Sequence, residues 1–167
     1  MSILKIFTYP SPILRLRATE LETIDQEALA LIPLMKRAME DNNGIGLAAP
    51  QIGVSKRIIV VSLREIPRRG IKAERENHAF LNPQIHKYSK EKETDEEGCL
   101  SLPGVFVNVK RAYKVEVVAQ TPEGKEVNIR AEGLAARIFQ HEIDHLNGIL
   151  IIQRIGFWAR WKLRKKF

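Results

Sequence analysis

The chain has a single cysteine among its 167 residues, Cys99, so no disulfide can form within it. Disulfide frameworks belong mainly to small secreted proteins, so this scarcity favours a reducing compartment. Long apolar runs are also missing, because aliphatic stretches such as 58–61 and 149–152 are far too short to span a bilayer. The first residues have no secretory signal pattern. We therefore expect no membrane among its partners.

Acidic residues are absent from the last 14 positions, residues 154–167, which hold six of the lysines and arginines. The net charge of the whole chain is +7, which leaves only +1 for residues 1–153. With 44% hydrophobic and 28% charged residues, the composition is that of an ordinary globular domain. We predict one domain of residues 1–153, followed by a basic helical tail of residues 154–167.

Trp158 and Trp161 lie three residues apart in this tail, which places them on one side of a helix. One interpretation is an arm that docks on RNA phosphates or another acidic surface. The other is a solvated C-terminal helix whose tryptophans pack on the body of the domain. The sequence leaves both open.

The hydrophobic pattern predicts helices and strands in a mixed order. An N-terminal helix is predicted at residues 25–43, with an apolar face formed by Leu31, Leu34, Met35, Ala38 and Met39. Pro33 marks either its first turn or a kink. The sequence Asn-Asn-Gly at 42–44 ends this helix, and a second helix, at 134–147, ends at Gly148.

Strands are predicted at 57–63 and 79–85, with Pro83 indicating an edge or a bulge. Alternation over 113–117 and 127–129, with a turn at 121–124, predicts a hairpin. The charged stretches 64–77 and 87–97 are expected to be surface loops or exposed strand edges. Together these elements predict an α+β fold in which mostly antiparallel β-sheets pack around the late helix, with an N-terminal and a C-terminal helix.

The late helix carries the motif His-Glu-x-x-His, as His141, Glu142 and His145. Four residues make about one helical turn, so both imidazoles lie on one side and can bind one metal ion. Glu142 lies about 60° further round, within reach of water at that metal. We expect Asp144, on the other flank, to orient an imidazole. The alternative is that two buried histidines merely hydrogen-bond to the backbone.

A catalytic metal site of this kind needs a third protein ligand. Position 151 is Ile151, where metzincins carry a histidine, and no acidic residue follows Asp144, so metzincin and thermolysin-like patterns are excluded. The third ligand therefore comes from upstream, and the candidates are Cys99, His78, His86 and a carboxylate. We prefer Cys99, because a metal would explain the lone thiol, although a single cysteine is more often a small buried side chain. For both histidines, surface or structural roles are favoured.

Residues 44–51 read Gly-Ile-Gly-Leu-Ala-Ala-Pro-Gln, with two glycines that let the backbone lie against a ligand. The segment is neither a dinucleotide fingerprint nor a P-loop. Gln51 follows a rigid proline and is a well-fixed amide donor. Taken alone, the segment could be only a helix-ending turn.

Three segments together resemble the motifs of the peptide deformylase family: residues 44–51, Glu-Gly-Cys-Leu-Ser at 97–101, and Gln-His-Glu-Ile-Asp-His at 140–145. Their order and spacing match, as does Tyr-Pro-Ser-Pro-Ile-Leu-Arg at 9–15, so the resemblance extends to about residue 152. It implies a bacterial, cytoplasmic enzyme that removes formate from the N-formyl-methionine of nascent polypeptides. The expected partners are therefore nascent formylated chains, with no DNA.

The resemblance also implies roles for individual residues. Cys99, His141 and His145 would bind one Fe²⁺ ion, replaceable by Zn²⁺, Ni²⁺ or Co²⁺, whereas the spacing alone suggests zinc. Glu142 would take a proton from water and deliver it to the leaving amine. The Gln51 amide and the backbone N–H of Leu100 would stabilise charge on the formyl oxygen. The segment around Ile45 and Gly46 would pair with the substrate as an added strand, and Ile45, Leu134 and Ile138 would receive the methionine side chain.

The chain departs from the family at residues 104–107, which are apolar where several bacterial members carry an arginine that meets a substrate carboxylate. The basic tail resembles C-terminal extensions that dock some deformylases near the ribosome exit tunnel. Two rival functions remain at this point. One is a metallopeptidase of broader specificity, and the other is a non-catalytic RNA-binding relative that uses the metal structurally.

Overall fold

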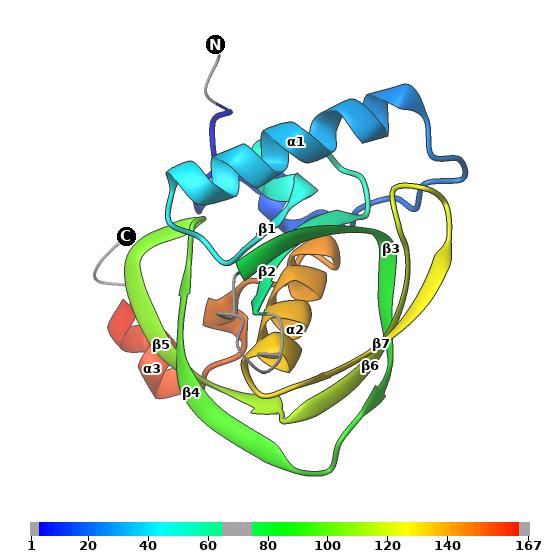
Figure 1. Ribbon diagram of the computed structural model, residues 1–167. Coiled ribbons are helices and arrows are strands. Elements are labelled where there is room, and N and C mark those ends of the chain that lie inside the picture. Colours follow the sequence, from blue (N-terminus) through cyan, green and yellow to red (C-terminus); the bar gives the residue numbers. More distant parts are fainter. Residues whose placement is uncertain (1–3, 65–74, 164–167) are drawn as a thin grey trace.

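The computed structural model describes residues 4–64 and 75–163 (Figure 1). The helices are α1 (Gln26–Asp41), α2 (Leu134–Leu146) and α3 (Phe157–Leu163), and short 3-10 turns cover Pro12–Arg15, Ala49–Ile52 and Ile151–Gln153. The strands are β1 (Gly46–Ala48), β2 (Ile58–Arg64), β3 (Arg75–Tyr88), β4 (Lys92–Cys99), β5 (Leu102–Ala112), β6 (Lys114–Gln120) and β7 (Glu126–Glu132).

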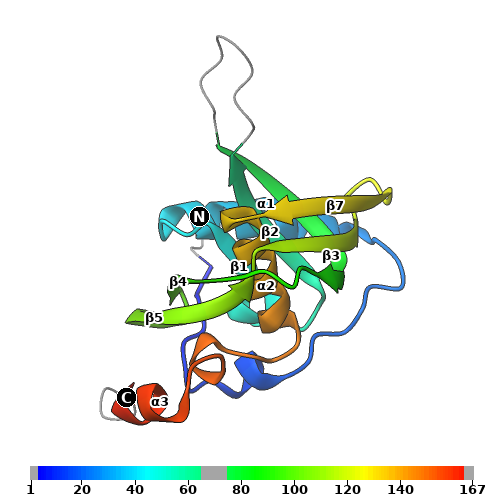
Figure 2. The ribbon, with the colours of Figure 1, turned by 90° about the horizontal axis from the view of Figure 1, so that it is seen from below.

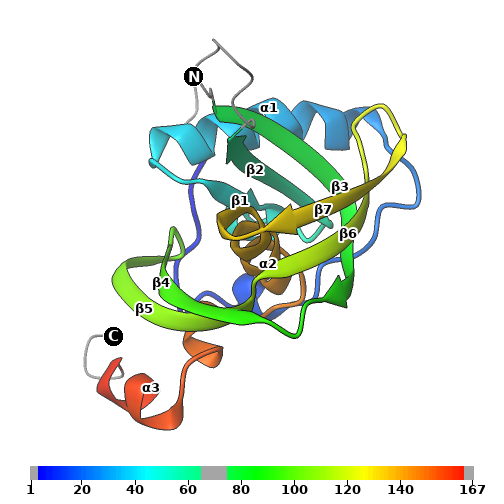
Figure 3. The same cartoon turned by 60° about the horizontal axis from the view of Figure 1, so that its bottom comes forward.

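Two antiparallel sheets surround α2. Five strands form one sheet in the order β1-β2-β3-β6-β7, and β4 pairs with β5 in a separate two-stranded sheet. Figure 3 looks nearly along α2 and shows the strands curving around it, while α1 covers the outer side of β1 and β2. The predicted α+β class with antiparallel sheets is confirmed.

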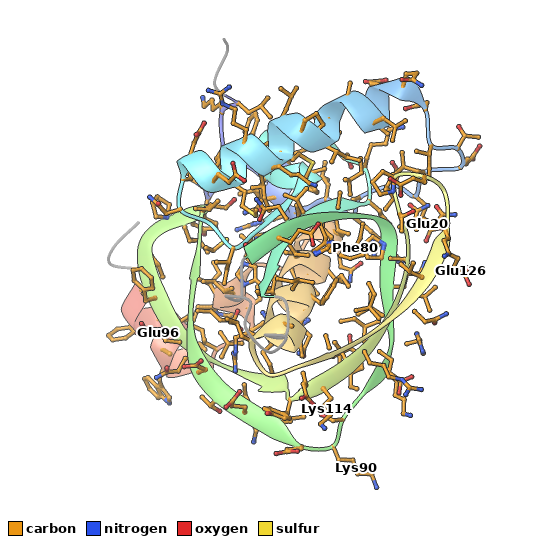
Figure 4. The ribbon with its side chains drawn as sticks, viewed as in Figure 1. Glu20, Phe80, Lys90, Glu96, Lys114 and Glu126 are labelled. Carbon is orange, nitrogen blue, oxygen red and sulfur yellow. The ribbon has the colours of Figure 1, made fainter. Side chains whose placement is uncertain are left out.

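The strand β2 separates two parts of the core because its successive side chains point to opposite faces. Ile59 and Val61 pack toward α2, whereas Ile58 and Val60 pack toward α1. All four are fully buried, as the aliphatic run predicted. Phe80 of β3 points inward in Figure 4, and its ring centroid lies 5.5 Å from that of Phe139 of α2. The core therefore holds α2 from the side opposite the β4–β5 pair.

The helix α1 begins where the sequence predicted, because the Asp25 side chain accepts a hydrogen bond from the Ala28 N–H at 2.8 Å. Pro33 lies inside the helix, so the interpretation that it marks the first turn is wrong. The expected apolar face was also partly wrong, since Leu34 is exposed. Leu34 lies about 100° around the helix from the buried Met35, so its side chain faces solvent.

The strand β3 is longer than the predicted 79–85. It starts at Arg75. Residues 65–74 lie outside the described ranges, so only Arg64 and residues 75–77 of the charged stretch 64–77 can be compared, and these lie in β2 and β3. The pairing register with β6 shifts between Leu81 and Gln84, and Asn82 has a φ of 49°. Pro83 therefore lies at a bulge, as expected, but in a central strand rather than at an edge.

Charged residues 92–97 form most of β4, which we expected to be a loop or an exposed edge. Five successive residues of this strand are exposed before Glu97 is buried. Its partner β5 was not predicted, because Pro103 and Gly104 interrupt the strand pattern. The predicted hairpin is present as β6 and β7, joined by a turn at Gly124 with a φ of 79°.

At the C-terminal end, Gly148 follows α2 with a φ of 72°, as the predicted stop requires. The helix α3 lies at the edge of the molecule, beyond the β4–β5 pair (Figure 2). Trp158 is 73% exposed, so it does not pack on the body of the domain. Within residues 4–64 and 75–163, no helix combines the length and apolar character needed to cross a membrane.

Candidate active site

Three potential metal ligands converge between the two sheets. Cys99 stands at the end of β4, and His141 and His145 lie one turn apart on α2. One donor atom from each lies within 4.8 Å of the other two, and the Cys99 Sγ is 3.1 Å from the His145 Nε2. The two imidazole centroids are 5.0 Å apart. The structure thus brings together the three side chains that the sequence singled out.

A local irregularity brings Cys99 to this position. The β4–β5 register shifts between Gly98 and Cys99, after which Cys99 pairs with Leu102 across a tight turn. A Cβ at Gly98 would lie 2.8 Å from the Phe106 ring, so a larger residue here would displace that ring. Glycine therefore allows the strand to turn its sulfur toward α2.

Glu97 fixes the orientation of His141, a role that the sequence analysis missed. The Nδ1 of His141 is 2.9 Å from a Glu97 carboxylate oxygen, which leaves Nε2 to face Cys99 and His145. Residues two apart on a strand point to the same face, so a carboxylate two positions before a ligating cysteine was the available signal.

Two buried arginines hold the Glu97 carboxylate. Arg111 donates to both of its oxygens, at 2.9 and 3.0 Å, and Arg137 donates to one of them at 2.8 Å. Burial alone would raise the pKa of Glu97, but the hydrogen bonds from His141 and Arg111 outweigh it and lower the pKa to about 2. Glu97 is therefore an anion at any pH at which the protein works.

Asp144 makes no hydrogen bond to an imidazole, so the expectation that it orients one directly is wrong. Its carboxylate accepts hydrogen bonds from Arg111, at 2.5 Å, and from Arg154. The side chain leaves α2 on the side of β5 and the tail rather than toward the histidine rings. Arg111 therefore bridges two carboxylates, Asp144 and Glu97.

The sulfur of Cys99 is in an environment that favours the thiolate. Burial raises the pKa of this thiol, but the positive charge of His145 and hydrogen bonds from both imidazoles place it well below its ordinary value. The thiolate is the form of cysteine that binds metals. The lone cysteine of the chain is thus prepared for a ligand role.

Glu142 follows the first histidine and is almost completely buried. Its Oε2 has no hydrogen-bond partner within the described part of the chain. Burial raises the pKa of this carboxyl to about 7, although the neighbouring His141 and His145 lower it. A carboxyl that titrates near neutrality is suited to accept and return a proton.

Gly46 lies directly against Glu142. A Cβ at position 46 would overlap the carboxyl group and the Cγ of Glu142, whereas no unusual backbone angle requires glycine there. Gly46 therefore provides the space that the Glu142 side chain occupies, in addition to its predicted place beside the substrate.

The Gln51 side chain is fixed through its amide oxygen, and its amide nitrogen points toward the candidate metal ligands. Its Oε1 accepts a hydrogen bond from the Ala48 N–H at 2.8 Å, which fixes the amide in the short turn after β1. Its Nε2 lies 3.1 Å from the Ser101 Oγ and 3.7 Å from the Cys99 Sγ. The donor end of the amide therefore points to the metal-ligand cluster.

A cavity of about 590 Å³ opens beside these groups. All seven of the residues predicted to bind substrate or to assist catalysis line it: Ile45, Gly46, Gln51, Leu100, Leu134, Ile138 and Glu142. Cys99 and His141 also reach it, and Phe106, from the apolar stretch 104–107, forms part of its wall. Within the described residues β1 pairs only with β2, so its other edge is available at this cavity.

His78 and His86 are not part of the cluster. Both lie on β3 with partly exposed side chains, and their rings are 3.6 Å from Glu76 and Glu116 respectively. The expected surface or structural roles agree with these positions.

Comparison with known proteins gives one family. The family profile described as Polypeptide deformylase matches residues 3–161. Peptide deformylase of Halothermothrix orenii is 47% identical over 155 residues, which cover 93% of this chain and 95% of that protein. Peptide deformylase 1B, chloroplastic, of Oryza sativa subsp. japonica is 41% identical over 92% of this chain, which spans only 55% of that longer protein.

Comparison of the fold with solved structures points to the same family. The crystal structure of peptide deformylase from Ehrlichia chaffeensis superimposes with a TM-score of 0.87 at 38% identity, covering 99% of this chain and 97% of that one. The chain belongs to the polypeptide deformylase family.

Proposed function

We infer that this chain is a metal-dependent peptide deformylase, which hydrolyses the N-formyl group of nascent polypeptides that begin with formyl-methionine. The observation that carries this is the convergence of Cys99, His141 and His145 beside a cavity that Glu142 also lines. Membership of the deformylase family identifies the reaction. No observation favours the metallopeptidase or the non-catalytic alternative.

The three side chains fit a catalytic metal. One thiolate and two imidazoles form a donor set of three protein ligands, and the adjoining cavity leaves room for a fourth, exchangeable ligand. We propose Fe²⁺ as the resident ion, with Zn²⁺, Ni²⁺ or Co²⁺ as substitutes. A divalent cation held there supplies Lewis acidity, which polarises a carbonyl and lowers the pKa of water.

Glu142 moves the proton. Its carboxylate accepts a proton from the attacking water, whose oxygen forms a bond to the formyl carbon. When the bond between that carbon and the nitrogen breaks, Glu142 returns the proton to the leaving amine, and formate departs. Its buried oxygen without a partner among the described residues, and its place at the cavity, support both steps.

Gln51 and Leu100 stabilise the oxygen that becomes negative. The Gln51 Nε2 is aimed at the cluster by the Ala48 N–H on the opposite end of its amide. The backbone N–H of Leu100 follows directly after Cys99. Because the Gln51 amide is fixed before substrate binds, it stabilises the developing charge without reorganisation.

The substrate backbone pairs with the open edge of β1 near Ile45 and Gly46. Ile138 is buried and Leu134 is half-exposed on the first turns of α2, so they form an apolar wall with Ile45. This wall receives the methionine side chain.

A formate-release assay tests the function. The metal-loaded protein is expected to release formate from formyl-Met-Ala and to leave acetyl-Met-Ala intact. Glu142→Gln is the matched variant, since it keeps the shape of the side chain and removes the base. It should retain its metal and lose about 10²–10⁴-fold in rate. An unchanged rate in this variant, or cleavage of unformylated peptides by the wild-type protein, would contradict the proposal.

For the tail of residues 154–167 we propose docking on the ribosome in the bacterial cytoplasm, where formylated chains emerge. Exposed Phe157 and Trp158 and the positive charge of the tail support this. Deleting the tail should abolish salt-sensitive ribosome binding. Binding that survives the deletion with the same salt dependence would exclude this role.

A further inference from the structure

We propose that Arg154, the first residue of the basic tail, is a positioning residue for the metal ligand His141. It acts through three intervening side chains, Asp144, Arg111 and Glu97. The inference rests on the proposed function in one respect, namely that His141 binds a metal ion.

An unbroken series of charged contacts joins the two ends. The Arg154 guanidinium donates to both oxygens of Asp144, with its Nε at 2.9 Å. One of these oxygens also accepts from Arg111 at 2.5 Å. Arg111 in turn donates to both oxygens of Glu97, which contacts the His141 Nδ1 at 2.9 Å.

The three central side chains of this series are buried, so their contacts depend on the one that Arg154 makes at the surface. The side chains of Glu97, Arg111 and Asp144 are 4%, 5% and 10% exposed, so water cannot replace a lost partner easily. Arg154 is 43% exposed and closes the series at the surface. The described contacts give one Asp144 oxygen no partner other than Arg154.

Loss of Arg154 would therefore change how Arg111 divides its hydrogen bonds between Asp144 and Glu97. Among the described residues, Arg111 would then be the only cationic partner of Asp144, and the guanidinium would be drawn from Glu97 toward Asp144. Glu97 would hold the His141 ring less firmly. Because Glu97 and Arg111 lie on β4 and β5 and Asp144 lies on α2, the same series ties the sheet that carries Cys99 to the helix that carries the histidines.

A simple charge effect predicts the opposite result. Removing a cation near a bound metal ion reduces repulsion, so on Coulombic grounds alone the metal would leave more slowly. A purely structural anchor for the tail predicts lower thermal stability with no change in metal release. The direction of the change in metal release therefore separates these possibilities.

The experiment uses the full-length protein loaded with Co²⁺, whose visible absorption reports the metal in its thiolate site during a chelator challenge. Loss of a direct partner of a ligating histidine typically costs 10–100-fold in metal affinity. Arg154 acts at a distance, so Arg154→Ala should speed release by about three- to tenfold, near or below the lower end of that range. Arg154→Lys should lie between Arg154→Ala and the wild type, because lysine can contact only one oxygen.

Arg160→Ala is the matched control, since it removes the same charge from the same tail and should release metal at the wild-type rate. In an Asp144→Asn background, Arg154→Ala should have little further effect, because the contact that couples them is already weakened.

Wild-type release from Arg154→Ala, slower release, or equal acceleration in Arg160→Ala would each overturn the inference. A wild-type protein that never acquires the Co²⁺ absorption would instead overturn the proposed function itself.

Discussion

Glu142 combines a strongly unfavourable position for a charge with a proposed role as proton acceptor, which requires one. Its carboxyl is buried against Gly46, and one oxygen has no partner in the described chain. The folded protein therefore favours the neutral acid, which is why the pKa is raised to about 7. A bound cation changes this balance by stabilising the carboxylate. Ionised Glu142 therefore destabilises the metal-free protein, and a bound cation would offset this cost.

Glu142→Gln should therefore stabilise the metal-free protein above neutral pH. The pKa of about 7 in the folded protein exceeds the ordinary value of 4.5, so the stability that Glu142 contributes is present below pH 4.5 and is lost as the pH rises through 7. Glutamine does not ionise and escapes this loss, which amounts to about 3 kcal/mol when complete. Urea unfolding with chelator at pH 5 and pH 8.5 measures it. Equal stabilisation at both pH values would contradict the assignment.

Glu97 shows the opposite linkage. Its folded pKa of about 2 lies below 4.5, so the stability it contributes is present above pH 4.5 and is lost as the pH falls through 2. At pH 7, Glu97→Gln should lower the free energy of unfolding by about 2–3 kcal/mol and weaken metal binding by about 10–100-fold. The exposed neighbour Glu96 is the matched control. If Glu96→Gln had the same effect on unfolding and metal affinity, the role of Glu97 would be wrong.

At the scale of single residues, the sequence predicted the three candidate metal ligands but not the side chains that hold them in place. A helical spacing of four fixes the relation of His141 to His145 without any tertiary information. The lone cysteine could be placed near them only by a family resemblance and by exclusion. The contacts of Glu97 and Asp144 depend on how β4, β5 and α2 cross, and the only local signal was the position of Glu97 two residues before Cys99.

Helices and strands with a strong local pattern were predicted, whereas an element that depends on a distant partner was not. The runs that built β2, α2 and the β6–β7 hairpin were predicted because each has one strong period and clear turn residues. The strand β5 was missed, since Pro103 and Gly104 lie within it and the partner that stabilises it, β4, is mostly charged. Strand propensity depends on pairing and packing, which are set by distant residues.

Two glycines with similar backbone angles provide a test of the junction after α2. Gly148 has a φ of 72° and its added Cβ would overlap the Arg15 carbonyl, whereas Gly124 has a φ of 79° with only Ile24 nearby, at 3.8 Å. Gly124→Ala should therefore cost about 1 kcal/mol for backbone strain alone. Gly148→Ala should cost clearly more, by about 2 kcal/mol or above, because the chain must also move.

Denaturant unfolding of the two variants, compared with the wild type, measures the difference. Equal losses would show that the contact between position 148 and the N-terminal segment does not restrain the end of α2. A larger loss for Gly148→Ala would show that the N-terminal segment fixes where the histidine helix stops.

In the whole molecule, the candidate metal site lies where separate structural units meet. The two-stranded sheet supplies Cys99, α2 supplies both histidines, and the five-stranded sheet supplies the open edge at the cavity. Lys90 points outward at the rim in Figure 4 and the Lys114 side chain is exposed, whereas His141 and His145 are buried. A metal ion bound there would join the β4–β5 pair to α2, which are also connected by the ion pairs of Arg111 and Arg137 and by the hydrogen bonds between Gln140 and the Ala112 backbone.

X-ray absorption spectroscopy of the metal-loaded wild-type protein tests the central claim, that one sulfur and two imidazoles bind a single ion. For a zinc-loaded sample, we predict one sulfur at about 2.3 Å and two imidazole nitrogens at about 2.0–2.1 Å from the ion. The sulfur contribution should disappear in Cys99→Ser. A loaded wild-type spectrum that contains no sulfur, or only one imidazole, would contradict it.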